Sequence, residues 1–292
     1  MVDQQVEHTN PKYIGIDIGG TNTRVGVFQS LELSTFELVA KFPTYQQYQQ
    51  QLQAIIGAIQ RSNLERIAGI GISIAGRIAR DGRSVIIAPN LPEYVGQPFA
   101  QDIARQFRCP VYLAHDAVCG LLAEKKFGHI HNFDRCAYLT VSTGTGAAIQ
   151  LSKASITLTS SIEIGHQILD GNQRVCLCGQ VGCLETFTGG KQITLRYGRS
   201  PAEITDTAFW ENFCHKLALG LVNLAMLTRI DAITISGAIV LQNTFLQSLL
   251  QQKVHDMIKG AVLELGIATL AENAPLVGAA LLLEVPEDTI LH

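Results

Sequence analysis

The residues with the clearest chemical potential in this sequence are three closely spaced cysteines and a histidine upstream of them. Cys176, Cys178 and Cys183 lie within one short segment, and His166 precedes it. Three thiolates and one imidazole form a ligand set suited to tetrahedral zinc. The alternative is three buried free thiols and an unrelated histidine, which the compressed spacing disfavours. With four protein ligands and no open position, the zinc is expected to be structural.

Glycines and carboxylates accompany this cluster. Gly179 and Gly182 are placed so that the backbone can fold tightly around an ion. Glu163 and Glu185 flank the ligands on either side, so the metal would position both carboxylates. The segment 170–174 is polar, and we expect that burial alone does not hold its shape.

A glycine-rich turn follows the first apolar run of the chain. Two glycines allow a tight turn whose backbone N–H groups can face an anion. Asp17, at the end of the run, is placed to hold a magnesium ion through water. The alternative is an ordinary hairpin turn, and the missing Gly-Lys-Ser/Thr excludes a Walker loop. The candidate phosphate-binding residues are Asp17, Gly19, Gly20, Thr21, Asn22 and Thr23.

A second turn of glycines and hydroxyl residues follows the apolar run 136–141. Either turn alone could be structural. Because both follow an apolar strand in two similar units, the pair favours a nucleotide phosphate site. The candidate residues here are Thr143, Gly144, Thr145 and Gly146.

His115 and Asp116 lie at the junction of a predicted strand and a predicted helix. A carboxylate at a helix N-terminus is favourable as a helix cap. The same position, beyond the carboxyl end of a strand, suits a ligand site in an α/β protein. Position alone therefore leaves two interpretations of Asp116 open, a cap or a general base that accepts a proton from a hydroxyl nucleophile.

Strand and helix patterns alternate along the chain, which places it in the α/β class. Short apolar runs predict strands at 13–18, 24–28, 37–42, 67–74, 111–114, 136–141, 147–151 and 232–236. Helical spacing predicts helices at 46–61, 97–107, 117–127, 209–229, 244–258 and 274–283. The stretch 157–190 is predicted to be loop-rich. The strand–turn–strand units at 13–28 and 136–151 resemble each other, so we infer an internal duplication of the fold.

Composition restricts the class of protein. The 292 residues are 47% hydrophobic and 16% charged, enough to build a sizeable core. The net charge of −3 provides no broad attraction to nucleic acid or to anionic membranes. No apolar run approaches the roughly 18 residues that span a bilayer, and the polar segment 1–11 lacks the apolar core of a secretory signal. We therefore expect a cytoplasmic protein.

The cysteine segment is highly specific. The pattern Glu-Ile-Gly-His, followed by Cys-x-Cys-Gly-x-x-Gly-Cys-Leu-Glu, is present in full at 163–166 and 176–185. On this pattern and the two turns, the chain resembles the ROK family of sugar kinases, within the actin-like ATPase superfamily. The resemblance implies a two-lobed, ribonuclease H-like α/β fold with a ligand cleft between the lobes. Residues 11–116 would form one lobe, with the helix 274–284 packing back on it, and residues 117–273 the other, with the zinc loop.

The resemblance also implies roles for individual residues. Asp116 would be the catalytic base, and the two turns would bind ATP with Mg²⁺, joined by Gly237 in an adenosine-binding turn at 236–238. His166 would both ligate zinc and contact the sugar. The sugar-binding residues implied are Gly76, Asn90, His115, Glu163, His166 and Glu185.

Several positions depart from the family pattern. His115 replaces the usual Asn before the catalytic Asp, Ala147 and Ala148 replace glycines after the second turn, and Gly237 stands alone in the adenosine turn. The leading hypothesis is a glucokinase-like hexose kinase with structural zinc, forming a homodimer by family analogy. An N-acetylhexosamine or other hexose kinase is the first alternative. A sugar-sensing protein with little or no catalysis is the second, since the family includes repressors.

Overall fold

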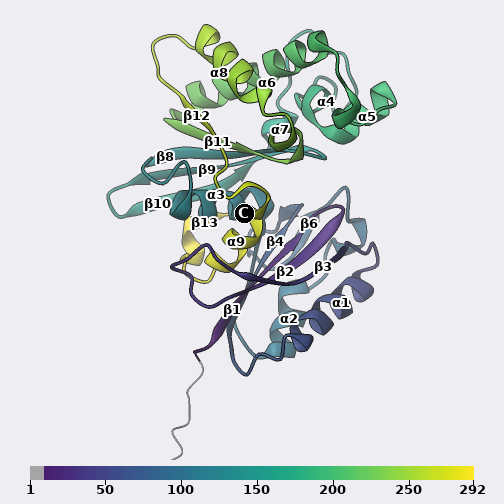
Figure 1. Ribbon diagram of the computed structural model, residues 1–292, viewed down its shortest axis with the longest axis vertical. Coiled ribbons are helices and arrows are strands. Elements are labelled where there is room, and N and C mark those ends of the chain that lie inside the picture. Colours follow the sequence, from purple (N-terminus) through teal and green to yellow (C-terminus); the bar gives the residue numbers. More distant parts are fainter. Residues whose placement is uncertain (1–9) are drawn as a thin grey trace, which may run out of the picture. The chain divides into compact units, whose positions relative to one another are not determined.

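The computed structural model describes residues 10–292, with the exception of the Glu287 side chain. The chain forms two compact units (Figure 1). Unit 1 contains the described residues up to Asp116 together with Leu276–Val285 and His292, and unit 2 contains Ala117–Pro275 and Pro286–Leu291. The polar N-terminal segment 1–11 lies outside the described residues as far as residue 9.

Unit 1 is built on a mixed five-stranded sheet in the order β3-β2-β1-β4-β7. The first three strands are antiparallel neighbours, whereas β1, β4 and β7 run parallel. Parallel strands end at the same edge, so the ends of β1, β4 and β7 lie together. The strands are β1 (Lys12–Ile18), β2 (Asn22–Phe28), β3 (Glu37–Pro43), β4 (Ile67–Ile74) and β7 (Val111–His115).

Helices cover both faces of this sheet. The helices α1 (Tyr48–Arg61) and α2 (Phe99–Phe107) bury their apolar sides in one core with isoleucines of β1 and β4. The α9 helix (Ala274–Leu281) packs so closely on the other face that a Cβ at Gly71 would lie 1.7 Å from the Ala279 carbonyl oxygen. Only glycine permits this approach. The segment 276–285 belongs to unit 1 although it lies between two segments of unit 2 in the sequence.

Unit 2 repeats this topology. Its sheet has the order β12-β11-β8-β9-β10-β13, and β8, β9 and β10 are antiparallel neighbours while β8, β11 and β12 run parallel. The order β10-β9-β8-β11-β12 therefore matches β3-β2-β1-β4-β7 strand for strand. This agreement is what the inferred duplication predicts. The strands are β8 (Arg135–Val141), β9 (Thr145–Lys153), β10 (Ile156–Ile162), β11 (Ala232–Ser236), β12 (Glu264–Ile267) and β13 (Ile290–Leu291).

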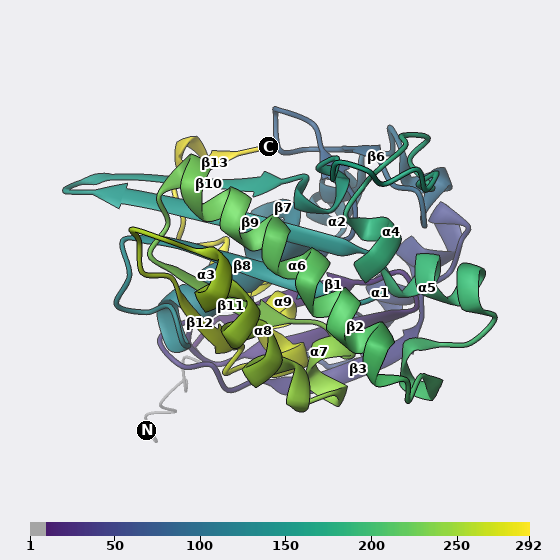
Figure 2. The same ribbon diagram turned by 90° about the horizontal axis from the view of Figure 1, so that it is seen from above.

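The long helix α6 (Thr207–Thr228) and α8 (Phe245–Met257) lie together on one face of this sheet (Figure 2). The α3 helix (Asp116–Phe127) covers the opposite face, where a Cβ at Gly120 would overlap the Tyr138 ring. Three short helices, α4 (Glu185–Thr188), α5 (Gly190–Tyr197) and α7 (Ala238–Gln242), surround the loops of unit 2.

The predicted elements agree with these within a few residues, with one clear error. The segment 157–190 is not loop throughout, because it begins with β10 and ends with α4. No prediction covered β12, β13, α5, α7, or the small hairpin of β5 (Arg77–Ile78) and β6 (Val85–Ile87). These elements are short, and periodicity identifies short elements poorly.

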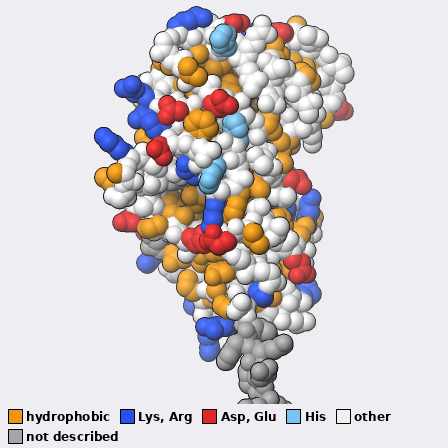
Figure 3. All heavy atoms as spheres, turned by 60° about the vertical axis from the view of Figure 1, so that its left-hand side comes forward, with side chains coloured by type: hydrophobic (Ala, Val, Ile, Leu, Met, Phe, Trp, Pro, Cys, Tyr) orange, Lys and Arg blue, Asp and Glu red, His pale blue; other side chains and the backbone are white. Residues whose placement is uncertain are grey.

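The helices and the surface of the protein bear on membrane insertion and on charge. Within residues 10–292, no helix is both long and apolar enough to cross a membrane. Figure 3 shows one face of the molecule, on which basic and acidic side chains are interspersed among hydrophobic and uncharged ones. This mixture agrees with the small net charge of −3.

Candidate active site

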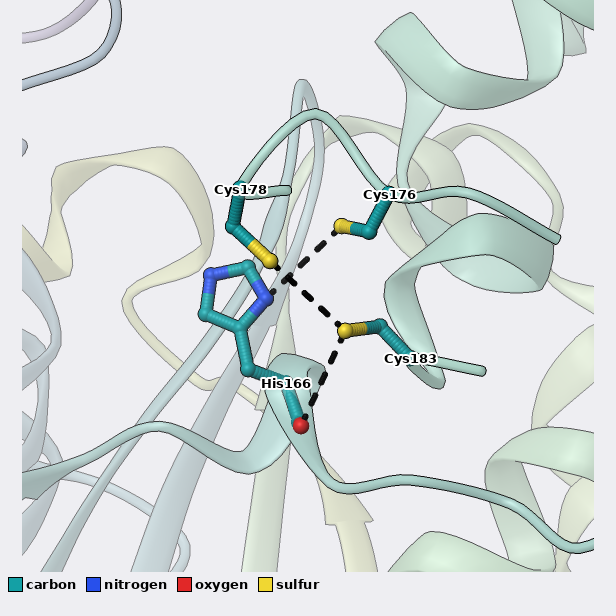
Figure 4. Close-up of side chains that lie close together, drawn as sticks. All are labelled: His166, Cys176, Cys178 and Cys183. Atoms are coloured by element: carbon teal, nitrogen blue, oxygen red, sulfur yellow. Dashed lines mark hydrogen bonds between the residues drawn. The ribbon is translucent and has the colours of Figure 1, made fainter. Parts of the chain in front are cut away.

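The four predicted metal ligands meet in unit 2. Their ligand atoms, the Nδ1 or Nε2 of His166 and the sulfurs of Cys176, Cys178 and Cys183, all lie within 4.8 Å of one another (Figure 4). The Cys178 and Cys183 sulfurs are 3.7 Å apart, and the Cys176 sulfur is 3.8 Å from His166 Nδ1. Bond lengths of about 2.3 Å to sulfur and about 2.0 Å to nitrogen in a tetrahedron require donor separations of about 3.6–3.8 Å. The four side chains therefore fit zinc.

The backbone around this centre folds as the two glycines predict. Gly179 and Gly182 have φ angles of +95° and +96°, which favour glycine. The Gly179 N–H donates to the Cys176 carbonyl, and the Gly182 N–H to the Arg174 carbonyl. Burial raises the pKa of the Cys176 thiol to about 12, so without a metal this thiol stays protonated at neutral pH. A bound cation reverses that preference, because it stabilises the thiolate.

The polar segment 170–174 was predicted not to be held by burial alone, and hydrogen bonds and a cation–π contact do help to hold it. Asn172 is buried, and its Nδ2 donates to the Cys183 carbonyl and to the Thr186 hydroxyl. The Arg174 guanidinium stacks on Phe187, 3.7 Å from the ring centroid. A polar side chain and a cation–π contact thus anchor this segment to α4, which begins at Glu185.

The first glycine turn joins β1 to β2. Gly20, Thr21 and Asn22 are exposed there, so their polar groups face solvent. Thr23 differs, because it is fully buried and its hydroxyl is bonded to Thr44 Oγ1 and to Gln51 Nε2. The buried Thr23 hydroxyl therefore stabilises the turn and is not available to bind phosphate.

Asp17 forms a largely buried ion pair at the end of β1. Its Oδ2 lies 2.8 Å from Arg24 Nη2, and its Oδ1 accepts a hydrogen bond from the Ser73 hydroxyl at 2.9 Å. Both charged side chains are 12% exposed. Burial raises the pKa of Asp17, with a smaller contribution from Asp116, and Arg24 and Ser73 oppose this shift. Arg24 was not singled out in the sequence, although its register opposite Asp17 on β2 brings them together.

His115 ends β7 and Asp116 begins α3. The Nδ1 of His115 lies 3.0 Å from Oδ1 of Asp116, and the two side chains are 23% and 28% exposed. The carboxylate is thus oriented by the imidazole and still reachable from solvent. Asp17 and Asp116 lie at the same edge of the unit 1 sheet, because β1, β4 and β7 run parallel and end there.

The two other predicted sugar contacts of unit 1 differ in their settings. Asn90 is partly buried, and its side chain lies next to Gly20, where an added Cβ would be 3.6 Å from Asn90 Cβ. Asn90 therefore lies beside the first turn. A Cβ at Gly76 would approach the Ile87 carbonyl oxygen to 2.8 Å, so Gly76 is needed for local packing whatever it binds.

The second turn is joined to the metal segment through Thr145. The Thr145 N–H donates to Glu185 Oε2 at 2.8 Å, and its hydroxyl lies 2.7 Å from Thr188 Oγ1. A Cβ at Gly165 would lie 2.3 Å from the Thr145 carbonyl oxygen. The N–H and hydroxyl of Thr145 are therefore engaged, which leaves Thr143, Gly144 and Gly146 as candidates for phosphate. Sequence spacing gives no signal for this junction.

Of the three sugar-binding residues predicted in unit 2, two lie together. His166 Nε2 is 4.0 Å from Glu163 Oε2, and the Glu163 carboxylate is 65% exposed. Since His166 presents Nδ1 to the sulfurs, its Nε2 remains on the side of Glu163. Glu185 has one carboxylate oxygen committed to Thr145.

A cavity of about 440 Å³ lies between the second turn and the segment that follows β11. Its wall is mainly apolar and includes Leu195, Pro201, Ala238 and Ile239, and Ser142 and Thr143 lie at its rim. Gly237 has a φ of +96°, and a Cβ there would lie 2.4 Å from the Val141 carbonyl oxygen. This glycine thus allows the segment after β11 to approach the end of β8 and so to shape the cavity.

Comparison with known proteins decides the family. The sequence pattern of the ROK family matches residues 13–285. The chain belongs to the ROK family. This ROK protein is 28% identical over 197 residues to a xylose repressor of Caldicellulosiruptor bescii and 29% identical over 189 residues to a glucokinase of Thermotoga maritima. These alignments cover 65% and 62% of the chain but only 49% and 58% of those relatives.

Other relatives match along their whole length. An N-acetylmannosamine kinase of Haemophilus influenzae is 24% identical over 95% of the chain and 98% of its own length. The crystal structure of a ROK hexokinase from Thermus thermophilus superposes with a TM-score of 0.76 at 25% identity, covering 94% of this chain and 98% of the other. The ROK protein therefore has the two-lobed actin-like ATPase fold of this family.

The residues that sequence reasoning missed in the ROK protein lie on α5 and on β2. Lys191 and Leu195 line the apolar cavity, and Arg24 neutralises Asp17. Neither group stands in a recognisable motif. The strand pairing of β1 with β2 is the only signal that could have indicated Arg24.

Proposed function

We propose that this protein is an ATP-dependent sugar kinase in which Asp116 is the general base. The observation that carries the proposal is the placement of Asp116 at the end of β7, partly exposed, with His115 Nδ1 3.0 Å away. A base must be accessible to its substrate and held in one orientation, and both conditions hold here.

The apolar cavity of unit 2 supports binding of ATP. Its volume of about 440 Å³ lies within the roughly 300–1,000 Å³ of small-molecule sites. An apolar wall suits a planar base, and the exposed Thr143 at the rim offers a donor to a phosphate. Ser142 and Thr143 also accept backbone hydrogen bonds from Gly190 and Lys191, so the rim is held rigidly to α5.

The mechanism assigns a separate task to each carboxylate. Asp116 accepts the proton of the sugar hydroxyl as the hydroxyl oxygen bonds to the γ-phosphorus of ATP. The bond from that phosphorus to the β–γ bridging oxygen breaks, and ADP leaves. Asp17, paired with Arg24, orients the water around the phosphates, while Gly20 and Thr21 contribute exposed donors. Mg²⁺ bound with ATP would neutralise phosphate charge.

Glu163, His166 and Glu185 of unit 2 are proposed to contact the sugar. Asn90 and His115 of unit 1 keep the sugar-binding roles that the family resemblance implies. Zinc held by His166, Cys176, Cys178 and Cys183 would fix this part of unit 2 without reacting. We propose glucose as the substrate, because the Thermotoga relative is named a glucokinase and the Thermus structure is named a hexokinase. An N-acetylated hexosamine is the second candidate, favoured by the Haemophilus relative, which aligns over the full chain.

A second function is favoured by a different observation. Relatives named as xylose repressors match this chain, and a repressor needs a sugar site but no turnover. The engagement of Thr145 by Glu185 removes one phosphate donor from the second turn, as a sensor with a reduced nucleotide site would show. Cytoplasmic location and a homodimer stay predictions under either function.

A coupled phosphorylation assay separates these possibilities. The zinc-loaded protein is incubated with ATP, Mg²⁺ and one of glucose, mannose, N-acetylglucosamine, N-acetylmannosamine or xylose. Turnover with glucose well above the other sugars supports the proposal. Sugar binding by calorimetry with no turnover on any sugar would contradict the kinase and support the sensor.

A further inference from the structure

A second, larger cavity of unit 2 lies behind the metal loop. Its volume is about 660 Å³, and it is formed by the segment 170–175, Phe187 of α4, Arg196 of α5 and Lys216 of α6. None of these residues belongs to the proposed sugar or ATP sites. Four separate segments of the chain therefore build one cavity for which the kinase reaction has no use.

The charges in this cavity are mainly positive. Arg174, Arg196 and Lys216 line it, and Asp170 is the one carboxylate among its lining residues. Asp170 Oδ1 accepts a hydrogen bond from the Gly171 N–H. In the described part of the chain, none of the three cations has a carboxylate oxygen within 4.0 Å.

The cations are held close to one another. Arg174 lies on the Phe187 ring at 3.7 Å, the Lys216 ammonium is 5.3 Å from the same centroid, and Arg174 donates to the Thr186 carbonyl at 3.2 Å. Arg196 lines the same cavity from α5. Like charges without counter-charges destabilise each other, so an anion among them would relieve this repulsion.

We propose that this cavity is an anion site that takes a phosphate-bearing small molecule the size of a sugar phosphate. Two guanidinium groups supply paired donors suited to phosphate oxygens, and the Lys216 ammonium adds a third charge. The volume exceeds what a single phosphate needs and accommodates an attached sugar ring.

Binding here would act on the metal loop. The Arg174 carbonyl accepts from the Gly182 N–H, and Asn172, at the cavity wall, holds the Cys183 carbonyl and the Thr186 hydroxyl. Fixing the segment 170–175 therefore restricts the ligand Cys183 and the start of α4, where Glu185 lies. An effect of the bound anion on sugar binding rests on the proposed function. The anion site itself does not depend on it.

The test is calorimetry on zinc-loaded full-length protein that is already saturated with a non-hydrolysable ATP analogue, so that the proposed nucleotide site is filled. Inorganic phosphate, glucose 6-phosphate and glucose are titrated separately. We expect glucose 6-phosphate to bind more tightly than phosphate, and the double variant R196Q/K216Q to weaken both at least about tenfold. The matched control R66Q/K259Q removes two exposed charges outside the cavity and should leave both affinities unchanged.

Hydrogen exchange gives a readout located at the site. Glucose 6-phosphate should slow amide exchange in 170–175 in the wild type and not in R196Q/K216Q. Equal affinities for the anions in R196Q/K216Q and in R66Q/K259Q would overturn the proposal. The absence of binding of either anion would also overturn it, and so would binding of acidic peptides or nucleic acid alone. Phosphotransfer is measured on the same samples, so a wild type that binds the anion but lacks turnover would contradict the kinase assignment alone.

Discussion

Two carboxylates of unit 1 illustrate how environment assigns chemistry at the scale of the residue. Asp17 is 12% exposed and paired with Arg24, whereas Asp116 is 28% exposed and in contact with the imidazole of His115. The first is confined by its partners and suits a fixed charge. The second is accessible and suits proton transfer, which is the division of labour that the proposed reaction needs.

Replacing Asp116 tests the base directly. Asp116→Asn keeps the shape and the start of α3 but removes the proton acceptor, so kcat should fall by about 10²–10⁴-fold. The dissociation constant for sugar, measured by calorimetry, should change little. Asp81→Asn, an exposed carboxylate of the same unit, is the control. Turnover of Asp116→Asn near that of the wild type would show that the base lies elsewhere.

Replacing Arg24 leaves a buried carboxylate without its counter-charge. Arg24→Met should destabilise the protein by about 3–5 kcal/mol at neutral pH, as for other broken buried pairs. The pKa of Asp17, already raised from 3.8 by burial, would rise further. Because the raised value lies in the folded state, the stability of the variant should be retained below about pH 4 and lost as the pH rises through that value.

Thermal unfolding from pH 4 to pH 8 measures this dependence. The double variant Arg24→Met/Asp17→Asn removes the charge as well as its partner and should recover much of the loss. A constant difference between Arg24→Met and the wild type over this range would mean that the pair does not control the ionisation of Asp17.

At the scale of the element, the segment 163–188 is a short run of chain with three kinds of support. The proposed metal joins His166 to the cysteines, Asn172 joins the loop to α4, and Thr145 joins the second turn to Glu185. Each support fixes a different part of the segment, so losing one should loosen the loop without unfolding unit 2.

Cys178→Ser tests the metal. Cys178 is the exposed member of the set, so its replacement perturbs packing less than that of the buried Cys183. We expect zinc content, by elemental analysis, to fall well below one ion per chain, and sugar affinity to weaken about tenfold or more although no cysteine contacts the sugar. Cys109→Ser, a partly buried cysteine of unit 1, is the control. Full sugar affinity in zinc-free protein would exclude this role.

At the scale of the whole molecule, the two units have the same sheet topology but different functional groups. Unit 1 holds the two carboxylates, while unit 2 holds the apolar cavity and the cluster of one histidine and three cysteines. The strand order is repeated, but only unit 2 has the insertion between β10 and α6 that contains the metal ligands. The two units therefore share a strand order and differ in the loops that connect the strands and helices.

Ligand-dependent stability distinguishes a kinase from a sensor at this scale. A ligand at 100 times its dissociation constant stabilises the folded state by about 2.7 kcal/mol. For a chain of this size, glucose and an ATP analogue should each raise Tm by roughly 4–5 °C. Stabilisation by sugar but not by the ATP analogue would favour the sensor. The Asp116→Asn variant should respond to both ligands as the wild type does.

Local properties of the chain were determined by the sequence itself. Apolar runs predicted the central strands of both sheets because a buried strand must be apolar wherever it packs. The group of candidate metal ligands was predictable because its cysteines are neighbours in the sequence. The positive φ angles of Gly179 and Gly182 were also predictable, because a tight turn is a local property of the backbone. The resemblance of this segment to ROK proteins added the family and the candidate residues.

Tertiary structure alone decided which of these candidates are available. Thr21 and Thr23 are equivalent in a sequence pattern, yet Thr23 lies within β2 with its hydroxyl buried against Gln51, whereas Thr21 lies in the exposed turn before that strand. Thr145 is engaged by Glu185, 40 residues away. Both cavities of unit 2 are formed by segments that are distant in the chain. Such partnerships depend on how strands and helices pack against one another, which no spacing within a single segment encodes.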